Sequence, residues 1–141
     1  ICPEDKPVKC WDVSGVTNMG YAFYGLNTFN KPLDCWDVSG TTEMSMMFSA
    51  ASAFNQSINE WNVSKVRSMK GMFKNAHDFD HPLASWDVSS VTRMGQMFRK
   101  ASKFNQNLNA WNVGRVQQME AMFKDAYLFN QPLASWDVSS V

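Results

Sequence analysis

The stretch WDVSSVTRMGQMF, residues 86–98, holds the pattern that decides the fold. A version of it starts at every tryptophan, and these recur at intervals of 25 residues, at Trp11, Trp36, Trp61, Trp86, Trp111 and Trp136. A fixed period of roughly 20–50 residues is typical of repeat proteins, whose units bury their apolar faces against one another. We therefore predict a stack of small repeated units rather than a globular enzyme.

The other large apolar residues keep this period. With each tryptophan counted as position 1, valine recurs at position 3, methionine at 9, phenylalanine at 13 and 19, and leucine or isoleucine at 23. We predict an N-terminal cap over residues 1–10, five repeats over 11–135 and the start of a sixth over 136–141. The chain begins at Ile1 and stops inside a unit, so we expect it to be part of a longer protein.

Each unit predicts a short strand followed by a helix. Residues 33–38 end in an alternation of apolar and polar side chains that is typical of a strand. Ser39 follows as a good helix N-cap residue. In the third unit, apolar residues at intervals of three and four then mark one face of a helix, namely Val66, Met69, Met72, Phe73 and Ala76.

Stacking such units predicts a curved molecule. Parallel strands lie about 4.8 Å apart, whereas packed helices need about 8–10 Å between their axes. The predicted fold class is therefore an α/β repeat solenoid, similar to leucine-rich repeats. Short parallel strands are expected on the concave face and helices on the convex face.

The unit also resembles a known family. The pattern Leu-x-x-Trp-x-Val is similar to the core of leucine-rich repeats, and residues 86–98 followed by Phe104-Asn105 resemble the 25-residue repeat of BspA-type surface proteins. The match covers residues 10–141 and departs from the repeat at Ala22, Thr41 and Gly114. The resemblance implies an extracellular or cell-surface module used in adhesion or protein binding, without catalytic residues.

Composition adds little about partners, and the cysteines bear on the compartment. The formal net charge is +0, and no apolar run is long enough to span a bilayer, so we expect at most peripheral contact with a membrane.

Cys10 and Cys35 share a repeat position in neighbouring units, and Cys2 lies within reach of Cys10. A disulfide would place the chain outside the cell or in an organelle lumen. Three reduced thiols are the alternative.

Two polar sets are candidate binding surfaces. Position 2 carries only acids and amides, a ladder that we expect on the solvent side of the concave face: Asp12, Asp37, Asn62, Asp87, Asn112 and Asp137. Turn-compatible residues facing solvent are the favoured explanation of this ladder, and binding of a polar peptide or a sugar is the functional alternative. Calcium between Asp12 and Asp37 is a further hypothesis with few oxygen ligands. The second set is basic and is expected on the convex helices: Lys65, Arg67, Lys70, Lys74, Arg93, Arg99, Lys100, Lys103, Arg115 and Lys124.

The basic set is compatible with an acidic protein or an anionic polymer such as a glycan, or simply with a soluble surface. Nucleic acid is disfavoured because exposed aromatics do not interleave with the basic residues. Only one local cluster has a metal-like composition, His77, Asp78, Asp80 and His81, and we interpret it as surface-loop variation. We predict no metal, no cofactor and no catalytic residue. The predicted function is a non-catalytic recognition or adhesion module, with a structural subunit of a larger assembly as the alternative.

Overall fold

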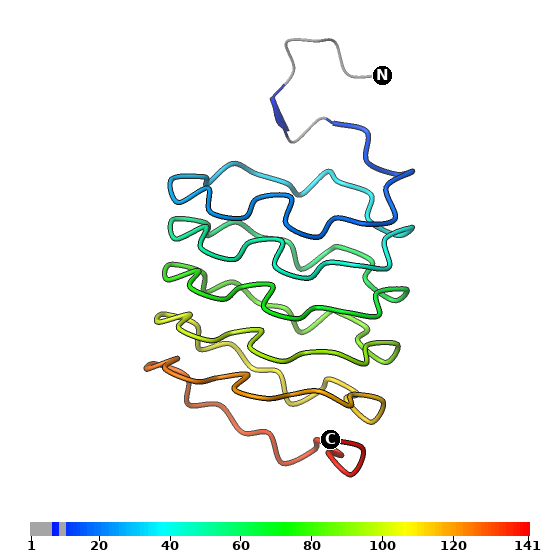
Figure 1. The fold of residues 1–141 in the computed structure, drawn as a ribbon, viewed down its shortest axis with the longest axis vertical. Coiled ribbons are helices and arrows are strands. Elements are labelled where there is room, and N and C mark those ends of the chain that lie inside the picture. Colours follow the sequence, from blue (N-terminus) through cyan, green and yellow to red (C-terminus); the bar gives the residue numbers. More distant parts are fainter. Residues whose placement is uncertain (1–6, 9–10) are drawn as a thin grey trace.

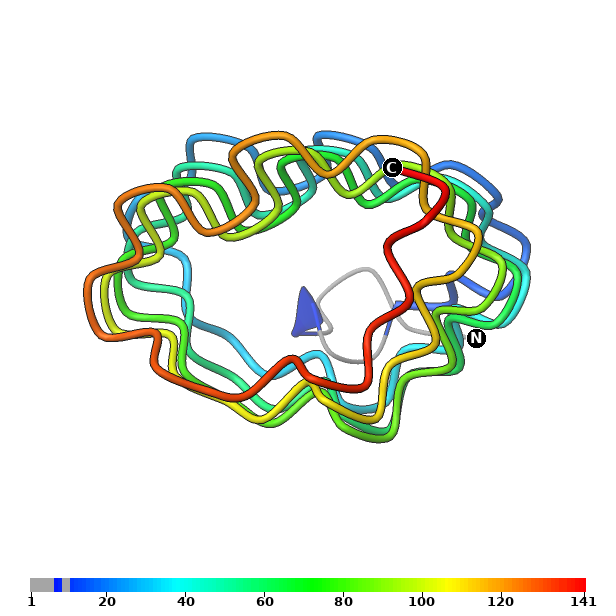
Figure 2. The same cartoon turned by 90° about the horizontal axis from the view of Figure 1, so that it is seen from below.

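The chain forms a stack of coils. The computed structural model describes residues 7–8 and 11–141, and successive 25-residue segments lie on top of one another (Figure 1). Seen along the stack, the coils superpose in one elongated outline, so residues 25 apart are neighbours (Figure 2). We number the coils 1 to 5, and they comprise residues 11–35, 36–60, 61–85, 86–110 and 111–135.

The coils contain almost no regular secondary structure. The described residues include no α-helix and no β-strand, so the predicted α/β solenoid with concave strands and convex helices is wrong. Parallel pairing is limited to one residue per coil, at position 8, in the series Asn18, Glu43, Ser68, Arg93 and Gln118. Within the described part of the chain, no helix has the length and hydrophobicity to cross a membrane.

Left-handed backbone conformations explain why the expected helix does not form. An α-helix needs a φ near −63° at every residue. In coil 2, Met46 has a φ of 58° and Ala50 a φ of 60°. Both residues interrupt the segment in which the sequence predicts a helix. The same two positions, 11 and 15, are left-handed in every other coil: Tyr21, Gly25, Gly71, Asn75, Gln96, Lys100, Ala121 and Asp125.

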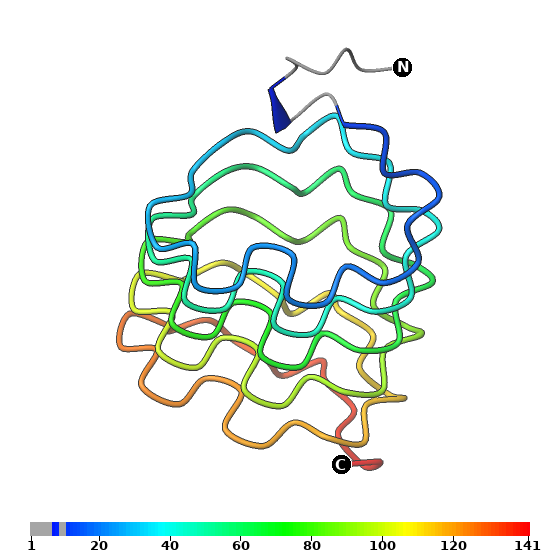
Figure 3. The same cartoon turned by 45° about the horizontal axis from the view of Figure 1, so that its top comes forward.

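Hydrogen bonds between coils take the place of helical ones. The backbone N–H groups at positions 9, 11, 13 and 15 donate to carbonyls of the next coil, as from Met44 to Ser68 (3.0 Å) and from Met46 to Lys70 (2.8 Å). We call positions 7–18 the turn side, because sharp bends recur there in each coil (Figure 3). Stacking neighbours, rather than a local helix, thus satisfy these backbone groups.

The remaining positions, 19–25 and 1–6, form the ladder side, where side chains join the coils. Each tryptophan from Trp36 onward donates its indole N–H to a carbonyl 28 residues earlier, as from Trp86 to Ile58 at 3.0 Å. Side chains at position 20 also join the coils, and for example the Oδ1 atom of Asn105 accepts the backbone N–H of Asn130 at 2.9 Å. We call this series the asparagine ladder, and it comprises Asn30, Asn55, Asp80, Asn105 and Asn130. The side chain at this position therefore satisfies a backbone N–H group of the next coil in each of coils 1 to 4.

Aromatic columns fill the interior between the two sides. Phe48, Phe73 and Phe98 stack at centroid distances of 5.6 Å. A second column packs against them, with Phe73 and Phe79 only 4.1 Å apart. The apolar positions at spacings of three and four are also fully buried, so the core was predicted correctly although the helix was not.

Candidate functional site: two equivalent grooves on the ladder side

The six residues of the predicted concave ladder lie in exposed turns. In each of them Oδ1 accepts the backbone N–H of the residue two positions later, as from Ser39 to Asp37 at 2.9 Å and from Gly114 to Asn112 at 3.2 Å. Ser39 and its counterparts are therefore turn residues and not helix caps. These bonds fix one atom of each ladder side chain and leave the other for solvent or a ligand.

The same bonds favour the ionised form of the ladder aspartates. The Ser14 hydroxyl donates to Asp12 at 2.7 Å and the Ser14 amide at 3.1 Å, and together they hold the pKa of Asp12 below its usual value of 3.8. The serine two residues later lowers the pKa values of Asp37, Asp87 and Asp137 in the same way. Hydrogen bonds to a carboxylate stabilise its charged form.

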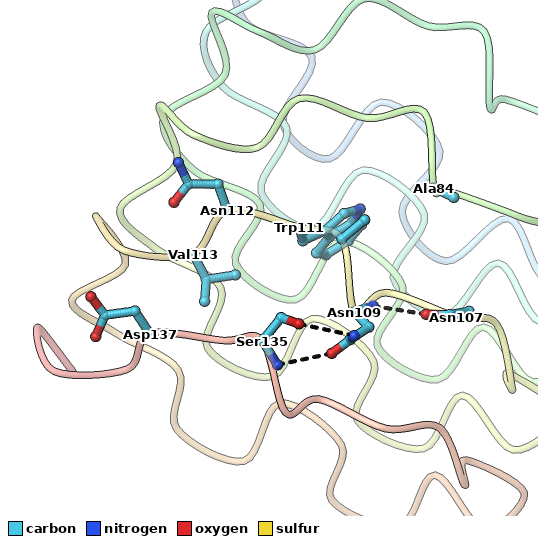
Figure 4. A pocket seen from close by; sticks show the side chains of 9 residues that line it. Ala84, Asn107, Asn109, Trp111, Asn112, Val113, Ser135 and Asp137 are labelled. Carbon is cyan, nitrogen blue, oxygen red and sulfur yellow. Dashed lines mark hydrogen bonds between the residues drawn. The ribbon is translucent and has the colours of Figure 1, made fainter.

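A groove of about 650 Å³ opens on the ladder side around coil 5 (Figure 4). Trp111, Asn109, Asn112, Ser135 and Asp137 are among the residues that line it. The Nδ2 amide of Asn109 donates to the Ser135 hydroxyl at 3.0 Å, and Asn109 Oδ1 accepts the Ser135 N–H at 3.0 Å. We call these two bonds the clamp. The clamp joins two coils on the ladder side, where the described coils share no backbone–backbone bonds.

A second groove repeats the first two coils earlier. It measures about 260 Å³ and is lined by Asn59, Glu60, Trp61, Asn62, Val63, Ser85 and Asp87. Asn59 and Ser85 form the same clamp, at 2.8 Å between Nδ2 and the hydroxyl and 3.2 Å between the backbone N–H and Oδ1. The two grooves are thus related by 50 residues, and they bring together Asn62 with Asp87 and Asn112 with Asp137.

Each groove is lined by one amide donor and one carboxylate acceptor. Asn112 Nδ2 donates no hydrogen bond among the described residues, and the Asp137 carboxylate, which accepts from Ser139, has lone pairs left for a ligand. The pair Asn62 and Asp87 is equivalent. Asp12 and Asp37 of the predicted ladder lie outside both grooves.

Sequence reasoning missed the clamp residues. The signal was present at position 24, where Asn59 and Asn109 alternate with Ala84 and Ala134. This alternation has the 50-residue period of the grooves themselves.

The predicted basic set is divided between the two sides. Lys65 and Arg115 occupy position 5 on the ladder side, and the charge of Lys65 contributes to the lowered pKa of Asp37. The other eight lie on the turn side, on bends rather than on the predicted helices. Three are paired, in Lys70–Glu120 (4.0 Å), Arg93–Glu43 (3.5 Å) and Lys103–Asp78 (2.8 Å).

The histidine cluster does not converge on one point. His77 Nδ1 lies 3.1 Å from the Ser102 hydroxyl, and His81 Nε2 lies 3.2 Å from the Asn55 carbonyl. Asp80 accepts the Asn105 N–H at 3.0 Å within the asparagine ladder. Over residues 7–8 and 11–141, no three His, Cys, Asp or Glu side chains come together as metal ligands would.

The disulfide prediction stays untested. Cys35 is exposed, with its Sγ 3.8 Å from Asp34 Oδ2. Its proposed partner Cys10, and Cys2 with it, fall outside the described residues.

Comparison with known proteins places the chain in a family. A family model described as "Mycoplasma protein of unknown function, DUF285" matches residues 3–92 and again residues 66–141. The chain belongs to this family. Two overlapping matches to one DUF285 pattern agree with the internal repetition, so the prediction of a repeat protein is confirmed. No curated protein and no solved structure matches the chain.

Proposed function

We propose that this DUF285 chain is a non-catalytic recognition module of a BspA-type surface protein, and that its two grooves bind an extended segment of a partner protein. The observation that supports the proposal is the duplicated groove. The same donor, acceptor and clamp recur two coils apart, at Asn62 with Asp87 and at Asn112 with Asp137.

The free atoms in each groove suit a peptide group. An extended polypeptide presents one N–H donor and one C=O acceptor per residue. The carboxylate oxygen of Asp137 can accept from such an N–H, and the amide of Asn112 can donate to the neighbouring carbonyl. Charge-assisted hydrogen bonds of the first kind are about twice as strong as neutral ones. Two equivalent grooves along one stack favour a ligand that runs along the stack axis.

The two grooves also supply the avidity that a surface module needs. When both engage one chain, the second contact is intramolecular and raises the overall affinity without any new kind of contact. A protein displayed outside the cell, as the BspA-type resemblance implies, gains adhesion by this route even when each groove binds weakly.

A matched pair of double variants tests this proposal. Asn62→Asp with Asn112→Asp replaces both free donors by acceptors, and the turn is kept because aspartate occupies this position in three neighbouring coils. The control, Asn75→Asp with Gln117→Glu, changes the charge equally on the turn side. On an array of extended peptides, we expect the groove variant to lose at least about tenfold in affinity, as expected for two lost hydrogen bonds, and the control to match the parent.

Equal binding by both variants and the parent would contradict the proposal. So would binding confined to glycans on a parallel glycan array.

A further inference from the structure

One row of basic side chains on the turn side differs from the other charged residues. Position 14 carries Lys74, Arg99 and Lys124 in coils 3, 4 and 5. Backbone bonds from Asn75 to Arg99 (2.9 Å) and from Lys100 to Lys124 (2.8 Å) hold these coils in register. Three cations therefore follow one another at the spacing of adjacent coils.

Three other basic residues of the turn side, Lys70, Arg93 and Lys103, form ion pairs with carboxylates, whereas Arg67 and Lys100 form none among the described residues. Two of these ion pairs join residues two coils apart, and the coil between them has a small residue at the same position. Glu43 pairs with Arg93 over Ser68, and Lys70 pairs with Glu120 over Gly95. A side chain at Gly95 would collide with Glu120, so the glycine keeps the path of this two-coil pair open. The fold thus accommodates charge pairs where the sequence provides them.

The position-14 row has no such pairs. Within the described chain, no carboxylate lies within 4.0 Å of the Lys74, Arg99 or Lys124 amino and guanidinium groups. Asp125 belongs to the adjacent row at position 15, alongside Lys100. Like charges on adjacent coils repel one another, as they do on adjacent strands of a sheet. An external anion would therefore stabilise this arrangement.

Arg99 at the centre of the row is under-satisfied. Its Nη1 atom lies 3.4 Å from Gln96 Oε1, and its buried Nε atom has no acceptor. An unpartnered buried donor is unfavourable. An anion that draws the guanidinium outward gives Nε a partner, and guanidinium groups bind oxyanions through two parallel N–H bonds.

The surroundings of the row select the kind of polyanion. Protein interfaces are anchored by aromatic and other large apolar residues, and single-stranded nucleic acids stack on aromatic side chains. Among the described residues of coils 3 and 4, which carry Lys74 and Arg99, no large apolar side chain is exposed, whereas Tyr127 and Leu128 are exposed in coil 5. A row of cations with no exposed apolar anchor in two of its three coils fits a linear polymer that carries its charges on a flexible polar backbone.

We propose that Lys74, Arg99 and Lys124 form a binding track for an acidic polysaccharide, separate from the ladder-side grooves. Sulfate or carboxylate groups on successive sugars would each meet one cation.

The test uses heparin as the probe. Lys74→Gln, Arg99→Gln and Lys124→Gln are combined, and the control combines Lys65→Gln, Arg67→Gln and Arg115→Gln, which remove the same charge away from the row. We expect the row variant to bind heparin at least about tenfold more weakly at physiological salt, because three charge-assisted contacts are lost, and the control to change less than about twofold. Unfolding midpoints of both variants verify that each is folded.

Two outcomes would overturn the proposal. Equal weakening in both variants would show that only net charge matters. Equally tight binding of polyglutamate would assign the row to an acidic protein instead. The double variant Asn62→Asp with Asn112→Asp should bind heparin as the parent does, which separates this inference from the groove proposal.

Discussion

The two long sides of each coil are held together by different means. On the turn side, backbone N–H groups at four positions per coil bond directly to the next coil. On the ladder side of the described coils, no backbone–backbone bond joins one coil to the next. The contacts there come from tryptophan N–H groups, asparagine and glutamine amides, and stacked rings. Backbone bonds are indifferent to side-chain identity, whereas ladder contacts require particular side chains at every repeat.

This difference explains where the sequence is free to vary. At position 14 of the turn side the chain tolerates Tyr24, Ser49, Lys74, Arg99 and Lys124 in successive coils. On the ladder side, position 1 is tryptophan in every unit. Function can therefore change on the turn side without harm to the stack, while the grooves of the ladder side depend on the residues that also hold the coils together.

Removal of one tryptophan should produce the largest effect. Trp86 is 3% exposed, stacks on Trp111 at 6.3 Å and donates its N–H to Ile58. We expect Trp86→Ala to lower the free energy of unfolding by about 3–5 kcal/mol, which is usual for deleting a buried indole. Urea unfolding followed by the fluorescence of the remaining tryptophans measures it. A loss below about 1 kcal/mol would show that the ladder side is not set by side chains.

Removal of an acceptor from the asparagine ladder should have the next largest effect on stability. Asn105 Oδ1 accepts from the Asn130 N–H and, at 3.1 Å, from Gln131 Nε2. We expect Asn105→Ala to cost about 1–3 kcal/mol, because both donors lose their acceptor. Asn105→Asp is the matched control and should cost less, because Asp80 already fills the equivalent place in coil 3. If both variants unfold at the same urea concentration, the oxygen acceptor is not what joins these coils.

A turn-side substitution should be favourable. Lys100 is exposed and has a φ of 59°, a conformation that costs most residues about 1–2 kcal/mol and glycine almost nothing. We expect Lys100→Gly to raise the free energy of unfolding by up to about 1 kcal/mol, reduced by the greater freedom of glycine in the unfolded chain. Lys100→Ile should lower it, because a β-branched residue tolerates positive φ poorly. The measurement is the thermal unfolding midpoint of the two variants and the parent. A higher midpoint for Lys100→Ile than for Lys100→Gly would contradict a left-handed conformation at residue 100.

The smallest effect concerns pH. Serine bonds lower the pKa values of Asp12, Asp37, Asp87 and Asp137 in the folded chain, so these groups favour folding above their unfolded pKa of 3.8. That contribution is lost as pH falls below this value through the folded pKa values. We expect the fourfold Asp→Asn variant to lose less stability than the parent between pH 5 and pH 3. The measurement is the unfolding midpoint of the parent and of the variant at several pH values in this range. If the serine bonds were absent in solution, the two midpoints would fall equally with pH.

The sequence predicted the core better than the elements. The spacing of Met69, Met72 and Phe73 correctly placed these residues inside, because a succession of tight turns can bury the same positions as a helix. The conformation at positions 11 and 15 decides between the two. Gly25, Gly71 and Asn75 occupy those positions and tolerate positive φ, which was the available signal. Met46, Gln96 and Lys100 at the same positions gave no hint of it.

The candidate site was predicted in part. The position-2 ladder was found because its polar residues stand out in the repeat, and four of its six members line the grooves. The clamp partners Ser85 and Ser135 could not be recognised, because they share position 25 with Cys35, Glu60 and Ala110 and become partners only through the stacking of adjacent coils.

The one-way hydrogen bonds of the turn side have an electrical consequence. The carbonyls at positions 8, 10, 12 and 14 accept from the earlier coil, and the N–H groups at positions 9, 11, 13 and 15 donate to the later one. Four peptide dipoles per coil therefore align along the stack, against opposing intercoil N–H bonds at positions 7, 8 and 18 of the described coils. Aligned peptide dipoles of about 3.5 D add up, as they do in a helix. The stack therefore acts as a macrodipole without a helix. Its positive end points from coil 1 toward coil 5, because the aligned N–H groups point to the later coil.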